Sequence, residues 1–335
     1  MKTRTTIGLA AVGVAVLAAG WLLGPGATGD SRVAVPPGTV VFPDLASKLQ
    51  TAAEVDVVAK GVTTRITRTG AQWGLADRGG YRVQQDKLRE LLTGLTELRM
   101  TEPRTSDPTQ YDRLGVDDPN SPASTANLLR VLDAQGKPIA ELITGHRRVR
   151  TAGNLPESLY IRRLGEAQSW LAEGRLPVDA DAQLWLERDV INIAGKDVVK
   201  LVASRGDTVL QFDRDGDKVA LTTPAEHPKL DEYRVDDVFR GLEQVTLSDV
   251  EPASVAREGK IGVATYTLAD QTVVTITLYR ADKDIWATFE AKDGRAASLQ
   301  PALAGWRFQI GAWKEKTYLP AIDELKASEP DKPAP

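Results

Sequence analysis

LRELLTGLTEL (residues 88–98) and VDDVFRGLEQV (residues 235–245) are the two stretches that decide the fold this sequence predicts. In both, apolar residues recur at positions i, i+3, i+4, i+7 and i+10, which is the buried stripe of an amphipathic helix. Both also carry Gly-Leu at the same place in the stripe, as Gly94-Leu95 and Gly241-Leu242. The match predicts that the chain contains two similar halves, each with one packed helix.

Runs typical of strands flank both stripes in the same order. Two short runs come before each stripe, and a hairpin and one further strand follow it. In the first half these runs are residues 62–68, 72–75, 128–132, 139–143 and 159–163, and in the second half they are 208–212, 218–221, 263–268, 272–279 and 285–290. Because short turns join antiparallel strands, the sequence predicts an α+β fold of two similar repeats, each an antiparallel sheet with a packed helix.

Shifts in composition set the expected domain boundaries. A Gly/Pro-rich spacer is expected over residues 25–50, the first repeat over 51–177, the second repeat over 178–324 and a disordered, Pro-rich tail over 325–335. The break between the repeats lies at Gly174 to Asp181. Tyr-Arg-Val accompanies each helix, at Tyr81 to Val83 and at Tyr233 to Val235, and this supports a duplication.

The N-terminus carries an unbroken apolar run, IGLAAVGVAVLAAGWLL, from Ile7 to Leu23, directly after Lys2 and Arg4. Roughly 17 helical residues span about 26 Å, within the lower range of membrane-spanning helices. The placement of the basic residues predicts a membrane anchor over residues 1–24, with a cytoplasmic N-terminus and an exported body. A single-pass protein of the inner (cytoplasmic) membrane is therefore expected. The alternative is a signal peptide cleaved after Ala27-Thr28-Gly29, and it exports the body as well.

The residue types exclude several classes of function. The formal net charge of -4 argues against nucleic acid as a partner. The chain has no cysteine. Disulfides, thiolate catalysis, thiolate metal sites and a lipidated N-terminal cysteine are therefore excluded.

Three motifs that resemble ligand sites have simpler explanations. GPGATG at residues 24–29 matches the dinucleotide fingerprint in letters, but prolines instead of a helix follow it, so we interpret it as a linker. DRDGD at residues 213–217 lacks the register of a calcium loop and lies between two strand runs, which predicts a hairpin turn. The basic run at residues 146–150 follows Gly145 and is expected in a solvated loop at a hairpin end. Its alternative role is contact with an acidic partner or anionic headgroups.

The sequence predicts no catalytic, cofactor-binding or metal-binding residue. The two histidines are His146 and His227, and no Gly-x-Ser-x-Gly or His-Glu-x-x-His motif accompanies them. Three pairs of acidic residues are expected on solvated turns and helix faces. These pairs are Asp117-Asp118, Asp231-Glu232 and Asp236-Asp237.

Tryptophans are the remaining candidates for a binding surface. Trp73 alternates with Leu75, and Trp306 alternates with Phe308 and Ile310, so these side chains are expected in the sheet core. An exposed aromatic strip that extends to Trp313, for a glycan or a protein partner, is the alternative.

Several motifs, in their order along the chain, resemble the DUF4340 family. They are Phe42-Pro-Asp-Leu45, Trp73-Gly-Leu75, Tyr81, the stripe at 88–98, Tyr111-Asp-Arg-Leu-Gly-Val-Asp-Asp-Pro119, Leu132-Asp-Ala-Gln-Gly136, Ile143-Thr-Gly145 and Tyr160-Ile-Arg162. The resemblance implies a single-anchor envelope protein of undefined biochemical activity, associated with ABC transporters of the gliding-motility auxiliary type. It implies no catalytic residue.

Three hypotheses of function follow. The leading one is a non-enzymatic, membrane-anchored, exported accessory or assembly module of a membrane protein complex. An ABC transporter is the partner that the resemblance implies. The second is a stand-alone binder of envelope glycan or lipid, and the third is a carboxylate-dependent hydrolase. No cofactor is expected under the leading hypothesis.

Overall fold

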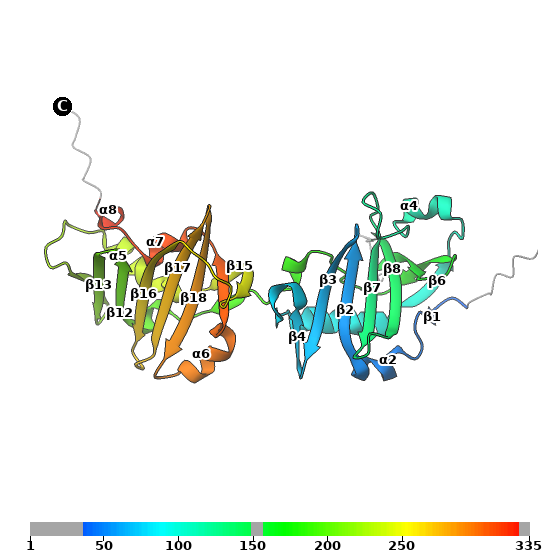
Figure 1. Cartoon of the computed structure of the whole chain (residues 1–335), viewed down its shortest axis with the longest axis horizontal. Helices are drawn as coiled ribbons and strands as arrows, with labels where there is room; N and C mark the ends of the chain where they lie inside the picture. Colours follow the sequence, from blue (N-terminus) through cyan, green and yellow to red (C-terminus); the bar gives the residue numbers. More distant parts are fainter. Residues whose placement is uncertain (1–35, 149–156, 328–335) are drawn as a thin grey trace, which may run out of the picture. The chain divides into compact units, whose positions relative to one another are not determined.

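The computed structural model describes residues 36–148 and 157–327, and its regular structure consists mainly of two antiparallel sheets (Figure 1). The expected α+β class is therefore wrong, because strands dominate and the helices are short. The stripe at 88–98 gives α3 (Gln85–Glu97), as predicted. The stripe at 235–245 gives only α5 (Glu232–Phe239), because the chain then tightens into a 3₁₀ turn at Arg240–Leu242 and enters a strand at Val245.

The membrane helix expected over residues 7–23 lies outside the described residues. Among the residues that the structure describes, no helix is both long and apolar enough to cross a membrane. The described part of the expected spacer belongs to the folded core, since Val41 and Leu45 are buried and α2 (Leu45–Lys48) begins there.

The first half of the molecule is a sheet of ten strands, in the order β1-β6-β10-β9-β8-β7-β2-β3-β4-β5. Its strands are β1 (Thr39–Val40), β2 (Ala52–Ala59), β3 (Val62–Thr69), β4 (Gln72–Leu75), β5 (Tyr81–Arg82), β6 (Arg99–Pro103), β7 (Asn127–Asp133), β8 (Pro138–Arg148), β9 (Ser158–Arg163) and β10 (Ser169–Glu173). The helix α3 is inserted in the chain between β5 and β6.

The second half is a sheet of nine strands, in the order β11-β15-β19-β18-β17-β16-β12-β13-β14. Its strands are β11 (Asp189–Ile191), β12 (Val198–Arg205), β13 (Thr208–Asp215), β14 (Lys218–Thr223), β15 (Val245–Pro252), β16 (Lys260–Leu268), β17 (Val273–Ala281), β18 (Asp284–Lys292) and β19 (Trp306–Ile310). Strand by strand, this order repeats that of the first sheet from β1 to β4. The helix α5 takes the place of α3 in the chain.

The strand runs read from residue alternation are confirmed. The run at 72–75 is β4, the run at 62–68 lies within β3, and the hairpin expected at 128–143 is β7 paired antiparallel with β8. In the second half, β16 and β17 form the corresponding hairpin. Alternation succeeds here because each strand has one face against a helix-covered core.

Each sheet has an inner face, covered by its helix, and an outer face. On the inner face of the first sheet, the buried side chains of α3 are Leu88, Leu91 and Leu95. In the second half, Val235, Val238 and Phe239 of α5 are buried, and the Tyr266 hydroxyl donates to the Val238 carbonyl at 3.0 Å. The helix α7 (Lys314–Tyr318) contacts α5 on the same side.

The chain between the two halves is bound to the first half. The Thr64 hydroxyl of β3 donates to the Ala180 carbonyl at 2.6 Å, and Lys87 of α3 forms an ion pair with Asp179. The Trp185 side chain is fully buried, and its indole N–H donates to the Asp179 carbonyl at 2.9 Å. The segment expected as a break at Gly174 to Asp181 is therefore bound to the first half. We call residues 174–185 the strap.

Candidate functional site

Three of the motifs that resemble the DUF4340 family meet on the outer face of the first sheet. The motif at 111–119 contains α4 (Tyr111–Leu114). Arg162 of β9 donates from Nε to the Val116 carbonyl at 3.0 Å, and its guanidinium lies 4.5 Å from the centre of the Tyr111 ring. Gly145 of β8 lies directly beneath, where a Cβ atom would overlap the Leu114 carbonyl oxygen. We call these motifs the signature cluster.

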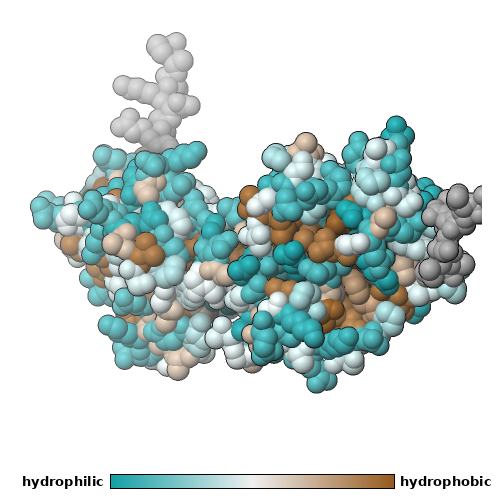
Figure 2. Space-filling model, turned by 45° about the vertical axis from the view of Figure 1, so that its right-hand side comes forward, coloured by the Kyte–Doolittle hydropathy of each residue, from teal (hydrophilic) through white to brown (hydrophobic). Residues whose placement is uncertain are grey.

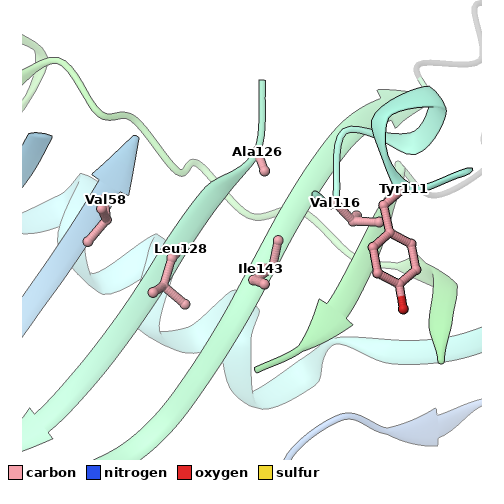
Figure 3. Close-up of a cluster of buried hydrophobic side chains, with 6 residues drawn as sticks. All are labelled: Val58, Tyr111, Val116, Ala126, Leu128 and Ile143. Atoms are coloured by element: carbon pink, nitrogen blue, oxygen red, sulfur yellow. The ribbon is translucent and has the colours of Figure 1, made fainter. Parts of the chain in front are cut away.

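A small hydrophobic core lies under the signature cluster (Figure 3). The side chains of Val58, Leu128 and Ile143 project from three neighbouring strands toward Tyr111 and Val116, while a helix runs behind the sheet. Apolar packing, a hydrogen bond to the Val116 carbonyl and the cation–π contact between Arg162 and Tyr111 hold a long connection on the sheet. We assign it a structural role.

The two histidines do not form a catalytic group. His146, at the exposed end of β8, has Nε2 3.1 Å from the Thr125 hydroxyl, whereas His227 lies in the second half beside the Pro228 carbonyl. The loop expected directly after Gly145 is wrong for residues 146–148, because β8 continues to Arg148. The strand has a glycine at this position because a side chain there would collide with the backbone of the signature cluster. Val149 and Arg150, the last residues of the basic run, lie outside the described residues.

Each predicted acidic pair has local partners. Asp117 accepts from the Ser124 hydroxyl at 2.7 Å, and Asp231 caps α5 by accepting from the Tyr233 and Arg234 amides. Asp236 and Asp237 form ion pairs with two arginines, Arg214 and Arg240. DRDGD leads into a hairpin turn as predicted, with Asp213 to Asp215 at the end of β13 and Gly216 and Asp217 in the turn before β14. Within residues 36–148 and 157–327, no group of three or more His, Asp or Glu side chains is placed to hold a metal ion.

A different carboxylate pair, Glu54 and Asp56, lies on β2, and no sequence pattern singled it out. Burial, and then the neighbouring Asp56, raise the pKa of Glu54. Arg65 of β3 contacts both, at 3.1 Å from Glu54 and 3.0 Å from Asp56. Alternate residues of a strand share a face, so the pair is a row of ion pairs across the sheet. The arginine between the acids gives it a structural role.

The second half carries a buried lysine at the end of α5. Lys314 of α7 donates from Nζ to the Gly241 carbonyl at 2.7 Å and to the Glu243 carbonyl at 3.1 Å. Burial lowers the pKa of Lys314 to about 8. The cation thus binds the free carbonyls where the helix ends. The Glu243 carboxylate accepts from the Gly195 amide at 2.7 Å, and this bond lowers the pKa of Glu243.

One exposed aromatic side chain adjoins this lysine, and another lies on α5. Trp313, next to it in the chain, is 65% exposed, and Tyr233 on α5 is 87% exposed. A cavity of about 340 Å³ is lined by residues of both helices, including Asp237, Arg240 and Trp313. We call this surface of α5 and α7 the helical face of the second half. Exposed Trp, Tyr and Arg are the residue types enriched in the energetic centres of protein interfaces.

The expectation of buried tryptophans holds only in part. Trp73 and Trp306, the two expected in the sheet core, are half-buried, whereas Trp170, for which no burial was predicted, is buried. Trp313 stands outside the sheet, in line with the alternative of an exposed aromatic. Tyr233 gave no signal in the sequence, because its position on the solvent side of α5 is fixed only once the buried stripe is placed.

Comparison with protein families places the chain. Residues 73–271, more than half of the sequence, match the family described as "Domain of unknown function (DUF4340)". The chain belongs to the DUF4340 family. The DUF4340 match includes the signature cluster and α5. No curated protein and no solved structure matches the chain.

Proposed function

We propose that this DUF4340 protein is a non-enzymatic accessory or assembly module that docks on a membrane protein complex through the helical face of its second half. The observation that carries the proposal is the exposure of Tyr233 and Trp313 on neighbouring helices. Large aromatic side chains that are exposed are costly to hydrate, and they gain free energy when a partner covers them. Asp237 and Arg240 form a polar rim, which orients such a contact and makes it specific.

The proposed location and partner class rest on the sequence. The apolar run from Ile7 to Leu23 behind Lys2 and Arg4 supports a place at the cell envelope, outside the cytoplasm. The family resemblance supports an ABC transporter as the complex. In that assembly, ATP hydrolysis belongs to the partner, since this chain has no G-x-x-x-x-G-K-[ST] loop.

Site-specific photo-cross-linking in the native membrane tests the proposal. A photoreactive residue at Tyr233 or Trp313 should capture one membrane subunit, identified by mass spectrometry. Val62, which is 68% exposed in the first half, and Asp207, in an exposed turn of the second half, are the control positions. Tyr233→Ala and Trp313→Ala should each reduce recovery of the complex by about tenfold, as expected for central aromatic anchors.

The controls also report a competing surface. Figure 2 shows hydrophobic residues gathered in a hollow on the visible face of the first half, between hydrophilic margins. Capture of the partner from Val62 alone would assign docking to the first half and contradict the proposal. Absence of any cross-linked protein from Tyr233 and Trp313 would contradict it as well.

A second candidate function is binding of an envelope glycan or lipid. A separate cavity of about 470 Å³ in the second half favours it, because Tyr279 and Trp306 line that cavity together with polar side chains.

A further inference from the structure

The cavity of about 470 Å³ lies where two strands of the second sheet part. Residues 285–288 of β18 pair with residues 307–310 of β19. Beyond Thr288, β18 continues to Lys292 and leads into α6 (Ala296–Leu303), whose C-terminal end closes one side of the cavity. The Gln300 side chain of α6 donates to the Ala291 carbonyl and holds the helix on the strand. We call this cavity the fork cavity.

A buried arginine forms part of the wall of the fork cavity. Arg307 is only 4% exposed. Its Nη1 donates to the Glu251 carboxylate at 2.7 Å and to the Val255 carbonyl at 2.9 Å, and its Nη2 donates to the Ala253 carbonyl at 3.2 Å. Its Nε is buried without a hydrogen-bond partner in the described chain. The three bonds from Nη1 and Nη2 hold the guanidinium in place as a fixed part of the wall.

Other polar groups of the fork cavity are also uncommitted. Thr288, Glu290 and Lys292 line it, and within the described residues none of these side chains has a hydrogen-bond or ion-pair partner. They offer a hydroxyl, a carboxylate and an ammonium, which together donate and accept hydrogen bonds. The polar groups therefore suit a ligand that carries many hydroxyls.

Aromatic rings supply the apolar part of the wall. Tyr279 and Trp306 are both half-buried, so part of each ring stays accessible from the fork cavity. The Arg307 guanidinium lies 4.8 Å from the Tyr279 ring centre, and Trp306 meets the Tyr81 ring edge to face at 5.0 Å. These contacts fix the rings before any ligand arrives. A sugar ring has an apolar C–H face and a polar rim, which matches such a wall.

The charge balance selects for a neutral ligand. Glu290 and Lys292 carry opposite charges, and Arg307 is already ion-paired with Glu251, which it shares with Arg257. A phosphate or a carboxylate would satisfy the lysine and face the glutamate unpaired, at a cost in the partly desolvated cavity. The volume lies in the range of about 300–1,000 Å³ that is typical of small-molecule sites.

We propose that the fork cavity binds a short, neutral saccharide. The proposal gives the second candidate function a site and a ligand class, and it shares no residue with the helical face of the second half. Its test needs no partner protein, so its failure would leave the docking proposal standing.

Isothermal titration of the full-length chain, kept in a detergent without a sugar headgroup, tests this site. The probes are chitobiose, cellobiose and maltose, with glycine as a zwitterion and inorganic phosphate as an anion. At least one disaccharide should bind, and Glu290→Gln and Thr288→Val should each weaken that binding about fivefold or more. Glu258→Gln, an exposed acid of the same half outside the fork cavity, should leave the affinity unchanged.

Thermal unfolding of each variant shows whether it is folded, and both substitutions conserve side-chain volume. Binding of glycine or phosphate without any disaccharide would overturn the proposal. Absence of binding by every disaccharide would overturn it too. Equal affinity in the wild type, Glu290→Gln and Thr288→Val would place the saccharide elsewhere and contradict the fork cavity as its site.

Discussion

The two halves share a strand order and differ in what covers the outer faces of their sheets. In the first half, residues 104–126 connect β6 to β7 and fold over the outer face, where they bury the core under the signature cluster. In the second half, residues 253–259 make the corresponding connection, and Thr265, Thr275 and Thr277 on the outer face are only half-buried. The length of one connection thus decides whether a sheet face becomes core or surface.

The largest expected effect compares buried carboxylates on the two sheets. Glu251 binds Arg257 at 2.8 Å and Arg307 at 2.7 Å, and Arg307 has a side chain only 5% exposed. Asp56 binds Arg65, whose side chain is 48% exposed and can be hydrated. Glu251→Gln should lower the free energy of unfolding by about 3 kcal/mol and Asp56→Asn by about 1 kcal/mol. Urea unfolding measures both, and equal losses would show that burial of the arginine does not set the cost.

A second prediction tests the covering of the outer faces directly. Gly145→Ala places a Cβ atom against the Leu114 backbone and should cost about 2–3 kcal/mol of stability, because the signature cluster must move. Thr275→Ile adds bulk to β17 on the outer face, where the threonine is only half-buried, and should cost less than about 0.5 kcal/mol. Denaturant midpoints compare the two. A neutral Gly145→Ala would mean that the connection is loosely held.

The smallest expected effect concerns Lys314, the buried lysine at the end of α5. Burial holds its pKa near 8, below the ordinary value of 10.5. Between these values the unfolded chain binds more protons than the folded one, so this lysine makes the free energy of unfolding rise with pH. The wild type should gain on the order of 2 kcal/mol relative to Lys314→Met from pH 8 to 10.5. Lys283→Met, in an exposed turn, should follow the wild type, and a parallel profile for Lys314→Met would refute the assignment.

Local pattern predicted the elements better than it predicted the fold class. Alternation placed β4 and the β7–β8 hairpin, because each strand keeps one face on a core. The stripe from Val235 to Val245 gave a shorter helix, since Gly241 lies against the Tyr266 hydroxyl and the chain turns there. An apolar stripe in the sequence indicates which side chains are buried. It does not show that one helix buries them all, because a helix, a turn and a strand can do so in succession.

Matching tripeptides in the two halves proved to be structurally unlike. Tyr81 begins Tyr-Arg-Val in β5 and is fully buried, with its ring 5.0 Å from Trp306. Tyr233 begins the same tripeptide inside α5 and is 87% exposed. The difference in burial between Tyr81 and Tyr233 depends on contacts with segments far apart in the chain. The hydrogen bond between Lys314 and Gly241 also joins distant segments. No local signal could therefore have located the helical face of the second half or the fork cavity.

The strap between the halves has a consequence for how the chain is made. Trp185 is completely buried, its carbonyl accepts from the Gln84 amide at 2.8 Å, and the next residues lead directly into β11. A ribosome releases the chain from its N-terminus, so the first half stays incomplete until this tryptophan emerges. The residues that finish the first half are also those that start the second. The folding of the first half is therefore coupled in time to the start of the second half.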